Sequence, residues 1–340
     1  MSGISSKMLQ AAAGAKAVND YIAVSKGSST NGFMLLSHNS GSLSFAATYN
    51  IQTLSNAFSP DDNYIASGSN FGTITLLDHT TPGSVSLAAT YSLADFSQVH
   101  DVSFSSDGNY LGAAHFVSPY FTLLDHTTPG TLSLSATYVL PGNGRGVSFS
   151  SLGGIATAHA NGPFTLLDDT TPGVLTLSTT YFVGGPNNNG FSTEFSRSGD
   201  YVAVGLNGAP RFLLLTSSGN LSSTYTLPAT GFDIAFSPDD NYIAVAHSGS
   251  PYFTLLDHTT PGSVSLAATY TLPGPECFST SFSPSGDYIA IGHRNPNSDD
   301  IGFTLLDHTT PGSVSLAATY VIAGFASIVN KVRFTNTEQL

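Results

Sequence analysis

Histidines recur at fixed places in this sequence, and they are the residue type that metal sites and acid–base catalysts use most. One set lies in equivalent turns, most of which read Leu-Leu-Asp-His-Thr-Thr-Pro-Gly, and another set ends short apolar runs. The first set is His38, His79, His126, His258 and His308, and the second is His115, His159, His247 and His293. A zinc site needs three or four ligands that converge on one point. Ligands spaced one repeat apart do not converge, so we expect no metal and assign these histidines a structural role in every repeat.

Aspartates begin the same turns, where they invite a search for an acid–base pair. They are Asp78, Asp125, Asp168, Asp257 and Asp307. An aspartate at the start of a turn accepts a hydrogen bond from the backbone two residues on, which accounts for all of them without catalysis. No Ser-His-Asp arrangement, nucleophile elbow or phosphate loop is present. We therefore expect no enzyme and no cofactor, although an active site assembled from separate repeats would leave no such motif.

A repeat of four short apolar runs positions these residues. A phenylalanine marks each copy, at Phe58, Phe104, Phe149, Phe195, Phe236, Phe282 and Phe334, and subtraction gives spacings of 46, 45, 46, 41, 46 and 52 residues. In the clearest copy, Ile234 to Leu272, turn residues such as Pro261-Gly262 separate the runs. A period of about 40–45 residues with four strands in each unit is typical of a β-propeller. Glu194 and Arg333 stand directly before a marker phenylalanine, so we expect them to line an axial channel.

The two ends of the chain supply complementary parts of one blade. The first unit begins at Tyr21 with its second strand, and the chain ends with an isolated first strand over 331–335. Pairing these pieces removes the open sheet edges that invite aggregation. The sequence therefore predicts an all-β, seven-bladed propeller over 18–340, closed by its C-terminal strand. Residues 1–17 lie outside the repeat and are predicted to be a leader or an anchor segment.

The charge composition narrows the classes of partner. Of 340 residues only nine are Lys or Arg, and the net charge is −13. Nucleic-acid binding needs clustered cations, so we expect no nucleic-acid partner. No stretch approaches about 18 consecutive apolar residues, so we expect no membrane insertion. Cys277 stands alone and is interpreted as an inert thiol, because no basic neighbour is visible to lower its pKa.

Two resemblances bear on function. The segment Ser237-Pro238-Asp239-Asp240-Asn241-Tyr242-Ile243-Ala244 resembles the core of YVTN-type and WD-like propeller repeats, although the Trp-Asp pair of WD repeats is missing. That family includes lactonases on seven-bladed propellers, but none of their active-site acids or asparagines can be matched here. The near-identical repeats and the charge-poor surface are similar to propeller proteins of tailed bacteriophages. This second resemblance implies a virion component.

One set of connections is uniform and the other is diversified. The turns that contain Thr-Thr-Pro-Gly hardly change, whereas loops such as 69–71, 115–119 and 294–300 differ in every copy. Diversified loops on a rigid scaffold are where binding usually resides. Aromatic rings beside amide and guanidinium donors suit sugar or protein surfaces. The candidate binding residues, which we expect to be exposed, are Phe116, Tyr120, Arg211, Tyr252, Arg294 and Asn188, the last in the run 187–189.

These observations lead to a functional expectation with two alternatives. We expect a non-enzymatic structural protein of a tailed-phage virion, on the tail or the capsid surface. Its expected partners are other virion proteins and a glycan or protein of the host surface. A propeller enzyme of the lactonase or lyase type is one alternative, and a cytosolic interaction scaffold is the other.

Overall fold

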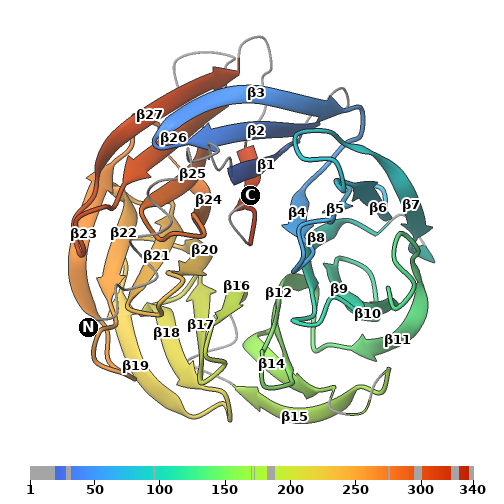
Figure 1. Ribbon diagram of the computed structural model, residues 1–340. Coiled ribbons are helices and arrows are strands. Elements are labelled where there is room, and N and C mark those ends of the chain that lie inside the picture. The colour runs from blue at the N-terminus through green and yellow to red at the C-terminus, as the bar shows by residue number, and fades with distance from the viewer. Residues whose placement is uncertain are drawn as a thin grey trace, which may run out of the picture.

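The structure is a computed structural model that describes residues 20–27, 32–94, 97–169, 171, 173–181, 188–274, 276–294, 301–322 and 329–336. The predicted leader over 1–17 lies outside these residues, as do 295–300 of one diversified loop and Asn187. Within the described ranges, seven four-stranded antiparallel sheets stand as blades around a common axis (Figure 1). The fold prediction is confirmed.

Each blade has four strands, named a to d from the axis outward. Strand a is β4 (Ser55–Phe58), β8 (Val99–Phe104), β12 (Gly144–Phe149), β16 (Gly190–Phe195), β20 (Gly231–Phe236), β24 (Cys277–Phe282) or β28 (Val329–Phe334). Strand b is β1 (Asp20–Lys26), β5 (Tyr64–Gly68), β9 (Tyr110–His115), β13 (Ile155–His159), β17 (Tyr201–Leu206), β21 (Tyr242–His247) or β25 (Tyr288–Arg294). Strand c is β2 (Phe33–Asn39), β6 (Thr73–Asp78), β10 (Tyr120–Asp125), β14 (Gly162–Asp168), β18 (Arg211–Thr216), β22 (Tyr252–Asp257) or β26 (Ile301–Asp307). Strand d is β3 (Ser42–Tyr49), β7 (Ser86–Ser92), β11 (Ser133–Val139), β15 (Thr176–Tyr181), β19 (Leu221–Thr226), β23 (Ser265–Thr271) or β27 (Ser315–Ile322).

The ring closes as the sequence predicts. β28 pairs antiparallel with β1, so that one sheet has the order β28-β1-β2-β3. Beyond the paired strands, the Thr335 N–H donates to the Tyr21 carbonyl at 2.9 Å. The last strand of the chain therefore supplies the innermost strand of the first blade, and the sheet edge of that blade is paired.

The core lies between neighbouring blades. Every residue of β21 is buried, which fits its run of apolar residues on both faces. On one side of this blade, Phe236 and Ile243 pack against Phe212 and Leu214 of the preceding blade. Small and large side chains from facing sheets thus fill each gap, and the blades hold strand a rigidly around the axis.

The repeated polar residues of the turns are structural, as the sequence predicts. Asp257 Oδ1 accepts hydrogen bonds from the backbone and the hydroxyl of Thr259, at 2.9 and 2.6 Å. His258 donates from Nδ1 to the Asp240 carbonyl at 2.7 Å. At the far end of strand b, His247 Nε2 lies 2.9 Å from Thr254 Oγ1 on strand c. Cys277 is fully buried, and burial raises its thiol pKa well above the ordinary value. No helix in the described part of the chain has the length and apolarity to cross a membrane.

A one-residue bulge interrupts strand a near its start in six blades. The extra residue is His100, Arg145, Phe191, Phe232, Phe278 or Asn330. A bulge re-aims the side chain of the extra residue. Side chains three residues apart on a regular strand point to opposite faces, yet the bulge residue is half-exposed in all six of these blades, and the residue before the marker phenylalanine is half-exposed in four of them. The bulge therefore lets one strand present two side chains to the axis.

Candidate functional site

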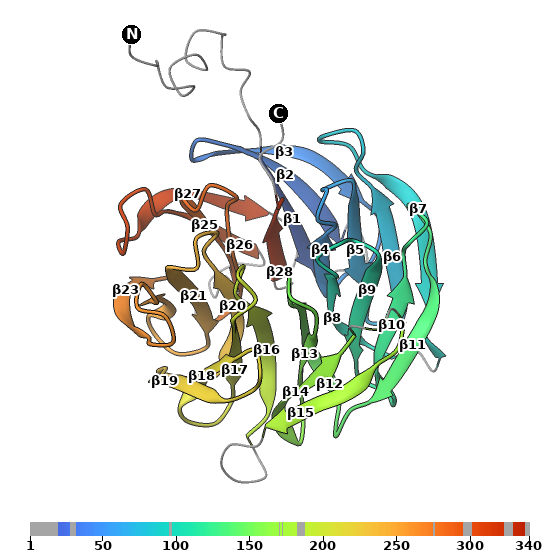
Figure 2. The ribbon, with the colours of Figure 1, turned by 60° about the horizontal axis from the view of Figure 1, so that its bottom comes forward.

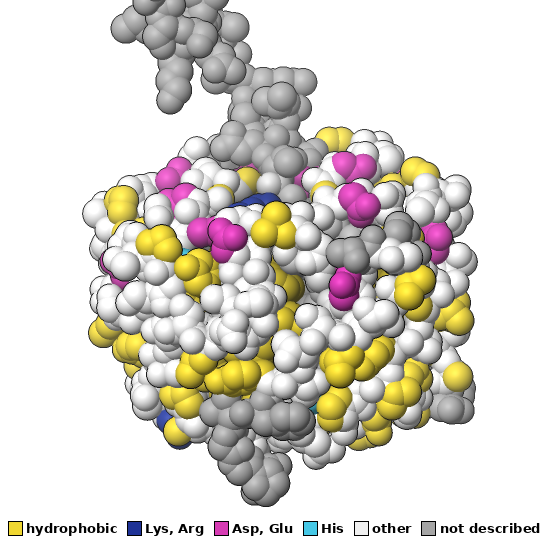
Figure 3. Space-filling view, turned by 90° about the horizontal axis from the view of Figure 1, so that it is seen from below, with side chains coloured by type: hydrophobic (Ala, Val, Ile, Leu, Met, Phe, Trp, Pro, Cys, Tyr) yellow, Lys and Arg dark blue, Asp and Glu magenta, His cyan; other side chains and the backbone are white. Residues whose placement is uncertain are grey.

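The axis of the ring runs between two different faces. We call the face with the a–b and c–d turns the turn face, and the face with the b–c and d–a loops the loop face (Figure 2). Turn aspartates such as Asp61, Asp78 and Asp239 make the turn face acidic, and Figure 3 shows carboxylates mainly in the upper half of its view. Arg145, Arg211 and Arg294 belong to the loop face, where strand a and strand c begin. The two faces therefore differ in the charged side chains that they carry.

The bulge residues form an aromatic arc around the axis at its loop-face end, which we call the loop-face mouth. Phe191 and Phe232 meet edge to face with ring centroids 5.5 Å apart, and Phe232 stacks on Phe278 at 5.3 Å. The Arg145 guanidinium lies 4.2 Å from the Phe191 ring centre, and that of Arg294 lies 6.0 Å from the Phe278 ring centre. All three rings are half-buried. We call these three phenylalanines with the two arginines at their ends the aromatic arc.

His100 continues the ring of bulge residues next to Arg145. Both ring nitrogens lie near acceptor oxygens, with Nδ1 3.0 Å from the Gly144 carbonyl oxygen and Nε2 3.3 Å from the side-chain amide oxygen of Gln98. A neutral imidazole donates from one nitrogen only, and the shorter contact assigns the proton to Nδ1 and the lone pair to Nε2. Burial lowers the pKa of His100 from its ordinary 6.5, and the nearby Arg145 lowers the pKa further. The imidazole is therefore neutral at pH 7 and available as a base.

Arg145 has hydrogen-bonding capacity to offer a ligand. Its Nη1 is buried and has no hydrogen-bond partner among the described residues. Burial also lowers the pKa of the guanidinium from its ordinary value, but the group stays charged at pH 7. A buried guanidinium nitrogen without a partner is costly, and an oxygen atom of a ligand held in the mouth would satisfy it.

A buried ion-pair network separates this mouth from the other end of the channel. Lys331 Nζ lies 3.1 Å from both Asp101 Oδ1 and Asp233 Oδ1. Arg333 Nη1 donates to Asp233 Oδ2 at 3.0 Å. The two cations hold the pKa of Asp233 far below its usual range, against the effect of burial. The network joins the closing strand β28 to β8 and β20, so it fixes the position of strand a across the ring.

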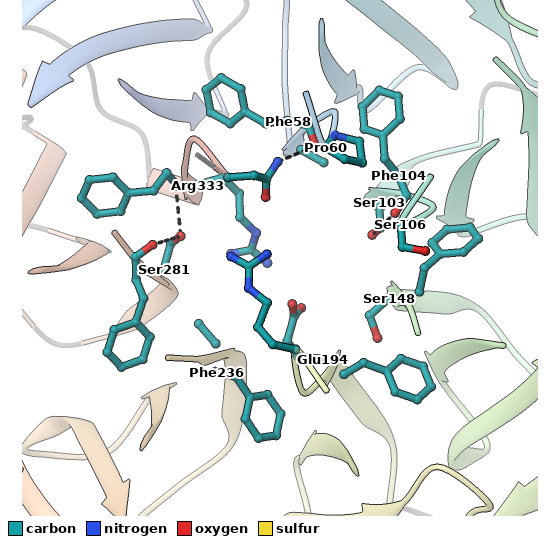
Figure 4. Close-up of a pocket in the computed structure, with 18 of the residues that line it drawn as sticks. Phe58, Pro60, Ser103, Phe104, Ser106, Ser148, Glu194, Phe236, Ser281 and Arg333 are labelled. Carbon is teal, nitrogen blue, oxygen red and sulfur yellow. Dashed lines mark hydrogen bonds between the residues drawn. The ribbon is translucent and has the colours of Figure 1, made fainter. Parts of the chain in front are cut away.

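At the turn-face end, the channel widens into a cavity of about 350 Å³. Figure 4 shows Glu194 and Arg333 directed into this cavity from different blades, together with Ser103, Ser148 and Ser281. Burial raises the pKa of Glu194 to about 7, although Arg333 opposes the rise. The prediction that Glu194 and Arg333 line the channel is confirmed. Groups of three or more possible metal ligands are absent from the described part of the chain.

Of the predicted binding residues, Phe116 and Arg294 lie at the loop-face mouth. Phe116 is 48% exposed and its ring lies 6.1 Å from His100, so it borders the mouth. Arg294 forms one end of the arc and pairs with Glu276 at 3.3 Å. Three of the residues stand first in strand c of their blades and have a left-handed backbone conformation: Tyr120, Arg211 and Tyr252. The Arg211 guanidinium donates to the Leu227 carbonyl at 2.8 Å. Asn188 is only 8% exposed, because it accepts the Gly208 N–H at 3.1 Å, so its expected exposure is wrong. The binding role of these residues stays a prediction.

The sequence analysis missed His100, Arg145 and the three phenylalanines of the arc. Each stands four residues before a marker phenylalanine, so an alignment of the repeats places them at one position. Their direction depends on the bulge, which has no sequence signature here. The overlooked signal is therefore the set of polar and aromatic residues at this one position of the repeat.

Comparisons with known proteins support the fold. The chain matches no model of a protein family and no curated protein. A Bacteroides uniformis protein with the provisional name 6-phosphogluconolactonase is similar, with a TM-score of 0.78, 13% identity and coverage of 93% of this chain and 99% of the other. The periplasmic gluconolactonase PpgL of Pseudomonas aeruginosa has a TM-score of 0.76, 16% identity and coverage of 93% and 99%. A Lactobacillus plantarum protein has a TM-score of 0.78, 15% identity and the same coverage.

These comparisons correct the functional expectation. The similar structures include proteins named as lactonases, so the expectations of a non-enzymatic virion protein and of no enzyme are wrong. Neither the resemblance to phage propellers nor the YVTN motif finds support among them. Of the alternatives left open, the lactonase-type enzyme fits the named neighbours best. At 13–16% identity the likeness establishes the fold, and the activity is argued from the side chains.

Proposed function

We propose that the protein is a hydrolase that opens the ring of a lactone at the loop-face mouth. The observation that carries this proposal is the neutral His100 beside Arg145, whose buried Nη1 has no partner among the described residues. Neighbours named as lactonases support the reaction class. The aromatic arc adds an apolar platform on which the carbon face of a sugar ring can lie.

His100 is the general base of the proposed reaction. Its Nε2 takes a proton from a water molecule as the water oxygen bonds to the lactone carbonyl carbon. The Gly144 carbonyl accepts from Nδ1 and so holds the imidazole in the tautomer that leaves Nε2 unprotonated. When the ring C–O bond breaks, the proton passes to the departing alkoxide. One lactone and one water yield one hydroxy acid.

Arg145 stabilises the charge that develops on the carbonyl oxygen. Its Nη1 points to no protein acceptor in the described residues, so it can donate to the oxyanion of the tetrahedral intermediate. The Phe191 ring lies against the guanidinium plane and limits its movement. The donor is therefore positioned before the substrate arrives.

The test is the opening of D-glucono-1,5-lactone, followed by acid release with the spontaneous rate subtracted. We expect His100→Gln to lower kcat about 10²–10⁴-fold and Arg145→Ala to lower it about 10²–10³-fold. The melting temperature shows that each variant is folded. Turnover that survives both substitutions would refute the proposed site.

The pH dependence adds an independent readout. The base must be unprotonated, and its pKa lies below 6.5. The value of kcat/KM should therefore be constant from pH 8 to 6.5 and fall as the pH drops through the lowered pKa of His100. The residual rate of the His100→Gln variant should lack this fall.

A further inference from the structure

The cavity at the turn-face end holds polar groups that the proposed reaction does not use. Ser148 is 3% exposed and lines the cavity, and its Oγ has no hydrogen-bond partner among the described residues. The hydroxyl of Ser103 makes only a long contact of 3.4 Å, to the Phe104 carbonyl. The buried Ser148 hydroxyl has a desolvation cost that no protein hydrogen bond among the described residues offsets, and the half-exposed Ser103 hydroxyl is open to a better partner. A hydroxylated molecule in the cavity would satisfy them.

The charged groups of the cavity suit a ligand that carries one negative charge. Arg333 Nη1 lies 3.0 Å from Asp233 Oδ2 and from the carbonyl oxygens of Thr280 and Val332, so its two N–H groups are shared among three acceptors and its guanidinium is fixed in place. Glu194 lines the same cavity and Arg197 lines its rim. A protonated Glu194 can donate a hydrogen bond to a carboxylate, and the guanidinium groups of Arg333 and Arg197 supply positive charge beside it.

We propose that this cavity is a second ligand site, for a small hydroxylated monocarboxylate. The carboxylate would lie between Arg333 and Glu194, and the hydroxyl groups would bond to Ser148 and Ser103. The surrounding turn aspartates disfavour ligands with two or more negative charges, because like charges repel within the screening length of about 8 Å. The inference does not depend on the reaction proposed at the loop face.

The proton on Glu194 links binding to pH. The groups that face Glu194 are Arg333, Asp233, Lys331 and Asp101, and together with burial they place its pKa at about 7. A bound carboxylate favours the protonated acid and raises this pKa. Binding should therefore weaken about tenfold between pH 6 and pH 8. A ligand with a positive charge would show the opposite trend.

The test is calorimetric titration with D-gluconate, and with D-glucitol and acetate as comparison ligands. Gluconate should bind most tightly, since glucitol lacks the carboxylate and acetate lacks the hydroxyl groups. Titrations are repeated in Arg145→Ala, which removes contacts at the loop-face mouth. Gluconate binding that disappears in this variant would place the ligand in the proposed active site and overturn the second site.

Three variants test the cavity itself. Arg197→Ala and Ser148→Ala should each weaken gluconate binding about 3- to 10-fold. Glu194→Gln should abolish the pH dependence, because an amide does not titrate. Ser86→Ala removes an exposed hydroxyl on the outermost strand β7 and is the matched control for Ser148→Ala, with unchanged binding. The proposal fails if gluconate does not bind at millimolar concentration, if binding tightens as the pH rises, or if Arg197→Ala and Ser148→Ala both bind as the wild type does. If gluconate binds in the cavity but the protein does not open the lactone, only the proposed reaction is refuted.

Discussion

The two ends of the channel are built from the same strand in each blade but carry different chemistry. At the loop face, the bulge residues provide three phenylalanines, a histidine and an arginine. At the turn face, the residue before the marker phenylalanine provides Glu194, Arg333 and serines around a cavity. The first set suits a flat ring with an electrophilic carbon, and the second suits a hydroxylated anion. The difference shows that a bulge, which adjusts the direction of side chains, lets the same strand present different chemical groups at the two ends of the channel.

Removing the closing strand β28 should have the largest effect on stability, because this strand contributes residues to both ends of the channel. Deletion of 329–340 takes away β28, its pairing with β1, and both cations of the buried network. We expect aggregation or loss of cooperative unfolding, measured by light scattering and thermal denaturation. A truncated protein that stays monomeric and melts at the wild-type temperature would show that closure is dispensable.

Breaking the buried ion-pair network alone should lower the free energy of unfolding. Lys331→Ala leaves Asp101 buried without its cation, and removal of one partner of a buried pair costs about 3–5 kcal/mol. Chemical denaturation measures the loss. The double variant Asp101→Asn with Lys331→Met removes both charges and should recover most of the stability. Equal destabilisation in the single and double variants would mean that packing, and not the ion pair, carries the effect.

Sequence reasoning predicted the scaffold better than the sites. The period of the marker phenylalanines and the split first blade fixed the number of blades, because strand pairing must close the ring. Glu194 and Arg333 were placed correctly, since the residue before a buried phenylalanine points the other way. His100 and Arg145 were missed because their direction depends on the bulge. Asn188 was misjudged, because a loop residue becomes buried when it bonds to a neighbouring loop.

The turn-face end should respond to pH through Glu194. Its pKa is raised from 4.5 to about 7, so the folded protein binds more protons than the unfolded chain between these values. The favourable contribution is complete below pH 4.5 and is lost as the pH rises through 7. Glu194→Gln should therefore stabilise the protein by about 1–3 kcal/mol at pH 8 and by little at pH 5. Denaturation at both pH values measures this, and an equal effect at both would contradict the raised pKa.

The smallest expected effect concerns the aromatic arc at the loop-face end. Phe278 stacks on Phe232 but contributes no group to the proposed chemistry. Loss of one stacking partner is worth about 0.5–1.5 kcal/mol, so Phe278→Ala should raise KM for the lactone about 2- to 12-fold and leave kcat nearly unchanged. Phe71 is the matched control, because it lies in the b–c loop that follows β5 and is 62% exposed. Phe71→Ala should leave both constants unchanged. If Phe278→Ala instead lowers kcat and leaves KM unchanged, the aromatic arc positions His100 or Arg145. The arc would then act in catalysis and not only in substrate binding.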